Sequence, residues 1–176
     1  DDVLGTWSAQ ASAMGIPSLI YTCDLDLLQV VDETTKVEVF SQYRDDRIFD
    51  VSSAMRRFGG IAPYNIPDLK ALMGDRSDNL EGVPGIGEKT ATSILQYTLD
   101  IESLYQEIDV VSRLPLRGKE RIMRLLTDYK DQAFVMKRLA TIVRDAPTGI
   151  DLGTSSIPKP DAGDIRNIKK GLASLR

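Results

Sequence analysis

The feature that most constrains the fold of this chain is a glycine-rich segment, GVPGIGEKTATSIL, at residues 82–95. Its alternating apolar residues and glycines, followed by apolar residues at helical spacing, predict a hairpin between two helices. Gly85 and Gly87 lack a Cβ atom, so the backbone there can turn tightly and approach a ligand closely. The amides that open the helix at Glu88 offer a seat for a phosphate, and Lys89 adds a positive charge beside it. The pattern favours binding of a DNA backbone; the alternative is an ordinary glycine-rich connection between helices.

A run of basic residues supports this interpretation. Five of them fall within twelve residues whose only acid is Glu120: Arg113, Arg117, Lys119, Arg121 and Arg124. The alternative is a solvated helix face. The formal net charge of -4 argues against a nucleic-acid partner when taken alone. A local concentration of charge can outweigh that total, so the hairpin and the basic run together predict two contacts along one strand of a duplex.

The acidic residues form three close pairs. Two carboxylates spaced i, i+2 at a strand end, or i, i+3 on a helical turn, share a face and together could hold one hard cation such as Mg²⁺ or Mn²⁺. Each pair has a simpler alternative, because aspartate also favours helix caps and turns. The pairs are Asp1 with Asp2, Asp24 with Asp26, and Asp75 with Asp78.

Histidine is absent and Cys23 is the only cysteine. These two facts exclude an internal disulfide, the usual Cys/His zinc sites and the Ser/His or Cys/His catalytic pairs. Any metal must therefore be held by oxygen atoms.

The apolar pattern predicts an α/β opening followed by a helical remainder. Helices are expected at 3–14 and 25–31, strands at 17–22 and 36–40, and a further helix at 51–58 behind the N-cap Asp50. Later helices are expected at 66–73, 88–97, 101–107, 119–129 and 131–140, then an extended connection at 145–164 and a last helix from about Ile165. No stretch approaches the roughly 18 apolar residues of a membrane span, so we expect a soluble, cytoplasmic protein.

The order of these motifs resembles that of the bacterial 5′-to-3′ exonucleases and flap endonucleases, a family that includes the N-terminal nuclease domain of DNA polymerase I. The motifs are DDVLG, TCDLDLLQ, GDRSDN and GVPGIGEKTA, at residues 1–5, 22–29, 74–79 and 82–91. Three positions depart from the family pattern without removing a carboxylate: Cys23 replaces a usual Gly, Leu25 a common Lys, and Glu81 a frequent Pro.

The resemblance implies a site with two Mg²⁺ or Mn²⁺ ions, which would clamp the scissile phosphate. The six aspartates that match the family's motifs would be catalytic residues and metal ligands: Asp1, Asp2, Asp24, Asp26, Asp75 and Asp78. The hairpin would hold duplex DNA and could bind K⁺ through backbone carbonyls. The expected DNA-binding residues are Gly82, Val83, Gly85, Ile86, Gly87, Lys89, Thr90, Arg117 and Lys119.

The implied fold class is α/β, with a truncated PIN-like (resolvase-like) three-layer sheet domain at 1–48 and an α-helical helix-three-turn-helix (SAM-like) DNA-binding domain at 49–143. A C-terminal tail at 144–176 would end in the last helix. The implied activity is hydrolysis of DNA phosphodiester bonds at 5′ ends, flaps or nicks during replication and repair, by a monomer. The family's first catalytic strand, its arch and a Glu before Asp1 are missing, so we expect a fragment that is inactive alone.

Two other functions remain open. A non-catalytic helix-hairpin-helix module would bind DNA with structural aspartates and without regard to Mg²⁺. A phosphatase or phosphotransferase could use Asp24 and Asp26 after their strand, but it would leave the hairpin unexplained.

Overall fold

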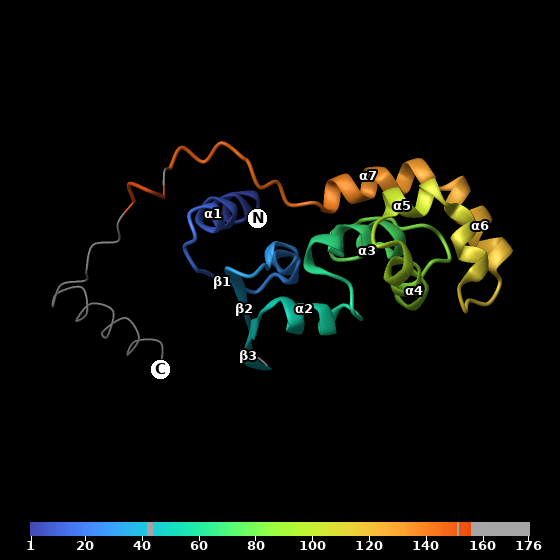
Figure 1. Cartoon of the computed structure of the whole chain (residues 1–176), viewed down its shortest axis with the longest axis horizontal. Coiled ribbons are helices and arrows are strands. Elements are labelled where there is room, and N and C mark those ends of the chain that lie inside the picture. Colours follow the sequence, from blue (N-terminus) through green and yellow to red (C-terminus); the bar gives the residue numbers. More distant parts are fainter. Residues whose placement is uncertain (42–43, 151, 156–176) are drawn as a thin grey trace.

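The computed structural model describes residues 1–41, 44–150 and 152–155 (Figure 1). Its N-terminal part is α/β, as predicted. The elements are α1 (Asp2–Ala13), β1 (Ser18–Thr22), the 3-10 helix η1 (Leu25–Val30), β2 (Thr35–Ser41) and β3 (Arg44–Phe49). The strands form one sheet in the order β1-β2-β3, in which β2 runs parallel to β1 and antiparallel to β3. The strand β3 was not predicted, and the final helix expected from about Ile165 lies outside the described residues.

From Val51 to Ala140 the chain forms helices joined by loops, again as predicted. It comprises α2 (Val51–Arg57), the 3-10 helix η2 (Pro63–Asn65), α3 (Ile66–Met73), α4 (Glu88–Thr98), α5 (Ile101–Gln106), the 3-10 helix η3 (Ile108–Arg113), α6 (Lys119–Asp128) and α7 (Lys130–Ala140). The predicted N-cap Asp50 forms a capping box with Ser53, which satisfies amides at the start of α2. The short helix η3 was not predicted. None of the described helices is both long and apolar enough to cross a membrane.

Two apolar clusters form the core. The larger cluster joins α3, α4 and α5 to residues of α6 and α7, with Leu72, Ile94 and Leu104 fully buried. The smaller cluster lies between one face of the sheet and η1, around Leu28 and Val37. Phe58, after α2, packs against both clusters and so joins the two parts of the molecule.

The segment that follows α7, residues 141–146, returns to the α/β part, and we call it the strap. Gln29 in η1 donates to the carbonyl of Ala140 at 3.1 Å and accepts from the amide of Ile142 at 2.9 Å. On α1, Gly5 lies so close to the strap that an added Cβ would stand 2.5 Å from Ile142. The strap is therefore packed against α1, and Asp1 and Asp2 line a hollow together with the end of α7.

Candidate functional site

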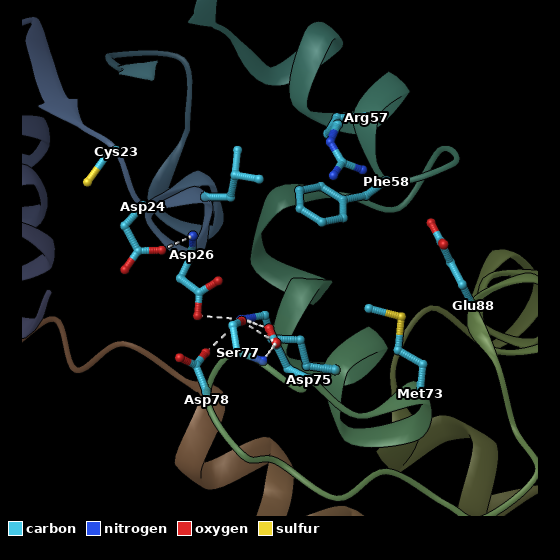
Figure 2. Close-up of a pocket in the computed structure, with 12 residues that line it drawn as sticks. Cys23, Asp24, Asp26, Arg57, Phe58, Met73, Asp75, Ser77, Asp78 and Glu88 are labelled. Carbon is cyan, nitrogen blue, oxygen red and sulfur yellow. Dashed lines mark hydrogen bonds and ion pairs between the residues drawn. The ribbon is translucent and has the colours of Figure 1, made fainter. Parts of the chain in front are cut away.

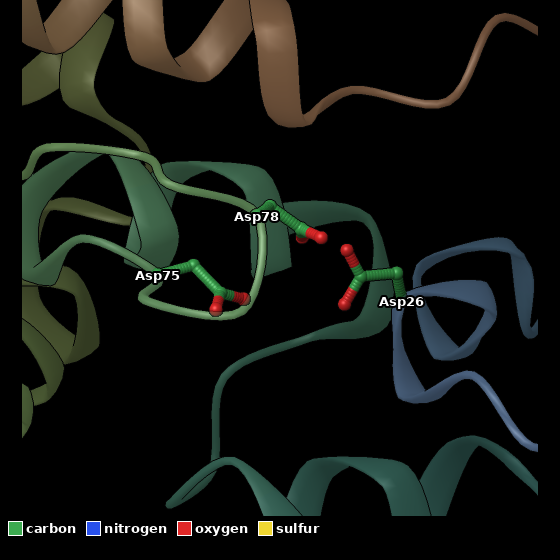
Figure 3. A group of neighbouring side chains, drawn as sticks. All are labelled: Asp26, Asp75 and Asp78. Carbon is green, nitrogen blue, oxygen red and sulfur yellow. The ribbon is translucent and has the colours of Figure 1, made fainter.

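Three of the six predicted aspartates meet in one cluster. Asp26 in η1 and the loop residues Asp75 and Asp78 each offer a carboxylate oxygen, and these oxygens lie within 4.8 Å of one another (Figure 3). Asp26 lies in the first turn of η1, shortly after β1, whereas the other two lie in the loop that follows α3. The cluster thus combines members of two different sequence pairs, and its oxygen atoms are the donors that hard divalent cations prefer.

Local hydrogen bonds shape the loop that carries Asp75 and Asp78. The backbone groups of Asp75 and Leu80 exchange hydrogen bonds of 2.9 and 2.8 Å, and the carboxylate of Asp75 accepts from the amide of Ser77 at 2.8 Å. The ends of the loop touch, because an added Cβ on Gly82 would lie 2.2 Å from the Gly74 nitrogen. This closure holds both aspartates on a single turn directly before the glycine-rich hairpin.

The cluster also contains a cation that sequence reasoning missed. Lys70 lies in α3 with its side chain only 5% exposed, and its Nζ atom contacts a carboxylate oxygen of Asp26, of Asp75 at 2.6 Å and of Asp78 at 3.3 Å. The sequence feature that could have identified Lys70 is its position as a lysine within a largely apolar helix. Burial alone would lower the pKa of Lys70, but hydrogen bonds to Asp26 and Asp75 raise it, so this lysine is charged.

The carboxylates respond to this environment in different ways. Burial raises the pKa of Asp26, against the attraction of Lys70, and the nearby Asp78 and Asp24 add to the rise. At Asp75 burial is outweighed by hydrogen bonds from Lys70 and Ser77, which lower its pKa to about 2. One ammonium cannot neutralise three carboxylates, so the chemistry of the cluster suits an additional cation.

The cluster forms part of the wall of two hollows. A hollow of about 520 Å³ has the cluster on one side and Arg57, stacked on the Phe58 ring at 5.3 Å, on the other (Figure 2). A second hollow of about 440 Å³ is lined by Asp1, Asp2 and the end of α7, and it shares three aspartates with the first: Asp24, Asp26 and Asp78. Each of the six predicted aspartates therefore lines at least one hollow. Asp75 lines only the first, and Asp1 and Asp2 line only the second.

The other three predicted ligands lie outside the cluster, and the carboxylates of two of them accept structural hydrogen bonds. The carboxylate of Asp24 caps η1 by accepting from the amide of Asp26 at 2.8 Å, and Asp2 accepts from the strap amide of Val143 at 2.9 Å. Asp1 is the N-cap residue of α1, although its side chain makes no capping hydrogen bond. Of the simpler alternatives, capping thus applies to Asp24, outside the cluster, whereas a turn role and clustering coincide at Asp75, which accepts from Ser77.

The two central glycines of the hairpin differ in what their backbone requires. Gly85 has a φ of +82°, in the left-handed region that favours glycine. Gly87 has a φ of −96° and open space for a Cβ, so its conformation does not require glycine. Val83 and Ile86 are buried in the larger core and anchor the hairpin. Their side chains therefore face the core, while Gly85, Gly87 and Lys89 are exposed.

The basic run divides into anchored and unanchored residues. Lys119 donates to the carbonyl of Ser112 at 2.8 Å, and Arg113 pairs with Glu107 at 3.1 Å. The ion pairs among the described residues include none formed by Arg117, Arg121 or Arg124. Arg121 lies beside the hairpin, since its guanidinium would be 3.7 Å from a Cβ on Gly85. Sequence reasoning placed Arg121 in the basic run but did not select it as a DNA-binding residue.

A family model described as "5′-3′ exonuclease, C-terminal SAM fold" matches residues 61–163, which include the loop, the hairpin and the basic run. The chain belongs to the 5′-3′ exonuclease family. The resemblance seen in the motifs is thereby confirmed, as is the SAM-like fold of the helical part.

Curated relatives from bacteria agree with this assignment. Over 152 residues, the exonuclease-family chain is 38% identical to DNA polymerase I of Bacillus subtilis, covering 86% of this chain and 17% of that protein. It is 36% identical over 152 residues to the 5′-3′ exonuclease of Buchnera aphidicola, covering 86% of this chain and 52% of that protein. The chain therefore spans about a sixth of the polymerase and about half of the separate exonuclease.

Solved structures show the same fold at lower identity. The T5 5′-exonuclease with bound divalent zinc ions aligns with a TM-score of 0.60 at 21% identity, covering 79% of this chain and 49% of that one. A bacteriophage T5 flap endonuclease in a pseudo-enzyme–product complex with DNA and metal ions aligns with a TM-score of 0.60 at 20% identity, covering 82% and 49%. Both likenesses concern the fold of this exonuclease-family chain.

Proposed function

We propose that this chain provides metal-binding and DNA-binding parts of a 5′-3′ exonuclease and flap endonuclease that acts on DNA in replication and repair, as a monomer and as part of DNA polymerase I. One observation carries the proposal: the loop that closes between Gly74 and Gly82 supplies two of the three clustered aspartates and leads directly into the exposed glycine hairpin. A phosphate held at the hairpin and a phosphate contacted by a cation at the cluster would then belong to the same DNA strand.

The residues that would hold divalent ions are those of the cluster, with Asp24, Asp1 and Asp2 in the adjoining hollows. Bound Mg²⁺ or Mn²⁺ would supply an activated water and neutralise charge on the phosphate. The protein's own contribution is to aim carboxylates from η1 and the loop at one point, and to support them from α3.

The DNA contacts would come from the hairpin and from the neighbouring helix α6. Exposed backbone at Gly85 and Gly87, with Lys89 and Thr90, suits a phosphate, and K⁺ could bind backbone carbonyls there. Arg121 lies beside the hairpin and extends the same surface, whereas Lys119 already has a carbonyl partner. Arg117, two residues before α6, remains a further candidate phosphate contact. These contacts would follow the backbone and so would not depend on base sequence.

The domain boundaries are part of the same proposal. Residues 1–48 would belong to a PIN-like sheet domain, 49–143 to the helix-three-turn-helix domain and 144–176 to a C-terminal tail. The exposed apolar side chains on the outer face of the sheet, among them Leu19 and Ile48, are compatible with a further layer there.

The test is cleavage of a 5′-flap DNA by the full-length protein, with Mg²⁺ and with EDTA. We expect flap release only with Mg²⁺, and its loss in Asp75→Asn and Asp78→Asn while DNA binding persists, because each variant removes a charged ligand. Asp109→Asn, an exposed acid of η3 outside the cluster, is the matched control and should cleave normally. Full cleavage by either cluster variant would rule out the metal assignment.

A non-catalytic DNA-binding module is the second candidate, and one observation favours it. Lys70 contacts all three clustered carboxylates, so these aspartates could serve structure alone. This candidate predicts duplex binding that is indifferent to Mg²⁺ and no flap release by the full-length protein.

A further inference from the structure

The most unusual side chain outside the predicted site is the buried lysine at its centre. In α3 the residues around Lys70 are mostly apolar and buried, and Lys70 itself is 4% exposed. Charged side chains are rarely buried unless they are paired. The three ion-pair partners of Lys70 are the clustered carboxylates, and together they can use the three N–H donors of its ammonium group.

These contacts fall on the same residues that would ligate a metal. The Nζ atom lies 2.6 Å from an oxygen of Asp75 and 3.3 Å from one of Asp78, and it also contacts Asp26. A divalent ion bound by all three carboxylates would meet this positive charge at close range. Because like charges repel most strongly where water is scarce, the ammonium and the metal compete for the oxygens.

We propose that Lys70 is a resident counter-ion, which holds the acidic cluster together without metal and which a divalent cation must displace in order to bind. This inference rests on the proposed metal site. Lys70 is thereby a positioning residue: it keeps carboxylates from η1 and the loop convergent, and it sets the metal concentration at which the site fills. The hollow of about 520 Å³ that Lys70 helps to line gives its flexible stem room to move aside.

The test measures Mn²⁺ binding to the full 176-residue chain by electron paramagnetic resonance, together with thermal unfolding in EDTA. Lys70→Met should bind Mn²⁺ at least about fivefold more tightly, because a competing charge is gone. Its unfolding midpoint in EDTA should fall by about 5 °C and recover with Mn²⁺. Lys70→Arg, which keeps the charge, should retain the weaker affinity of the unaltered chain.

Lys137 offers a matched control, since it also pairs with two acids, Asp68 at 2.7 Å and Glu102 at 2.6 Å, but outside the cluster. Lys137→Met should lower the unfolding midpoint without changing Mn²⁺ affinity and without recovery on adding Mn²⁺. If Lys70→Met folds under neither condition, Lys70→Gln, which keeps a hydrogen-bond donor, replaces it in the comparison.

The outcomes separate this inference from the proposed function. Equal or weaker Mn²⁺ binding by the neutral Lys70 variant would overturn the counter-ion role while leaving the metal site in place. No Mn²⁺ binding by any of the proteins would overturn both. Tighter binding confined to the neutral Lys70 variant would support both.

Discussion

The α/β part and the helical part of this molecule differ in how they complete their cores. The buried residues of the larger cluster all lie between Ile61 and Ala133, within the helical part. The smaller cluster includes Ile66 at the start of α3 and Ile142 in the strap, so the sheet relies on residues from outside the α/β part. The other face of the sheet exposes apolar side chains, among them Leu19 at 56%. The difference teaches that the helical part builds its core from its own residues, whereas the core of the α/β part includes residues from outside it.

The largest expected effect comes from paired truncations of two fully buried leucines. Leu104→Ala in the larger cluster and Leu28→Ala in the smaller one should each lower the free energy of unfolding by about 3 kcal/mol. Leu104→Ala should reduce the protection of backbone amides in both parts, because the core beneath the sheet includes residues of the helical part. Leu28→Ala should open the α/β part and leave α4 and α5 protected, as measured by native-state hydrogen exchange. Equal loss of protection in α4 in both variants would contradict the proposed asymmetry.

An intermediate effect is expected where the strap joins the two parts. Gly5→Ala adds a Cβ that would stand 2.5 Å from Ile142 and 3.2 Å from the carbonyl oxygen of Val143. Although alanine favours a helix over glycine by up to about 1 kcal/mol, the overpacking should dominate and destabilise the protein by about 1 to 2 kcal/mol.

Chemical denaturation of Gly5→Ala measures this balance. The control is Gln10→Ala, also in α1, which should change stability by less than about 0.5 kcal/mol. A net gain of stability in Gly5→Ala would show that the strap gives way easily and that the two parts are loosely joined.

The smallest effect should be confined to the helical part and should depend on pH. Partial burial alone would raise the pKa of Asp100. Hydrogen bonds from Ser103, whose amide donates at 2.7 Å, outweigh burial and lower this pKa. A carboxylate with a lowered pKa stabilises the fold above its unfolded pKa of about 3.9, and this contribution disappears as the pH falls through the folded pKa. Asp100→Ala should therefore cost about 1 kcal/mol at pH 7 and progressively less below pH 4 in urea unfolding. A difference from the unaltered chain that stays constant between pH 7 and pH 2 would exclude this capping role.

Local signals explain which elements could be predicted. The helices α3 and α4 were expected at 66–73 and 88–97 and are observed at Ile66–Met73 and Glu88–Thr98, because glycines and helical spacing act over a few residues. The strand β3 was missed because its sequence, RDDRIF, is mostly charged and lacks the apolar pattern of a buried strand. It forms by pairing antiparallel with β2, a contact that its own residues do not signal.

For the candidate site, the sequence by itself determined which groups are available: carboxylate oxygens rather than histidine or paired cysteines, three aspartate pairs, and a glycine-rich hairpin beside them. Only the tertiary structure decided which carboxylates converge, since Asp26 meets Asp75 and Asp78 where η1 packs against α3. It also decided that Lys70, 44 residues from Asp26 along the chain, lies at their centre. The physical reason is the distance along the chain over which each signal acts. Residue type and spacing determine local structure and the chemistry of each side chain, whereas contacts between residues far apart in sequence depend on how whole helices and strands pack.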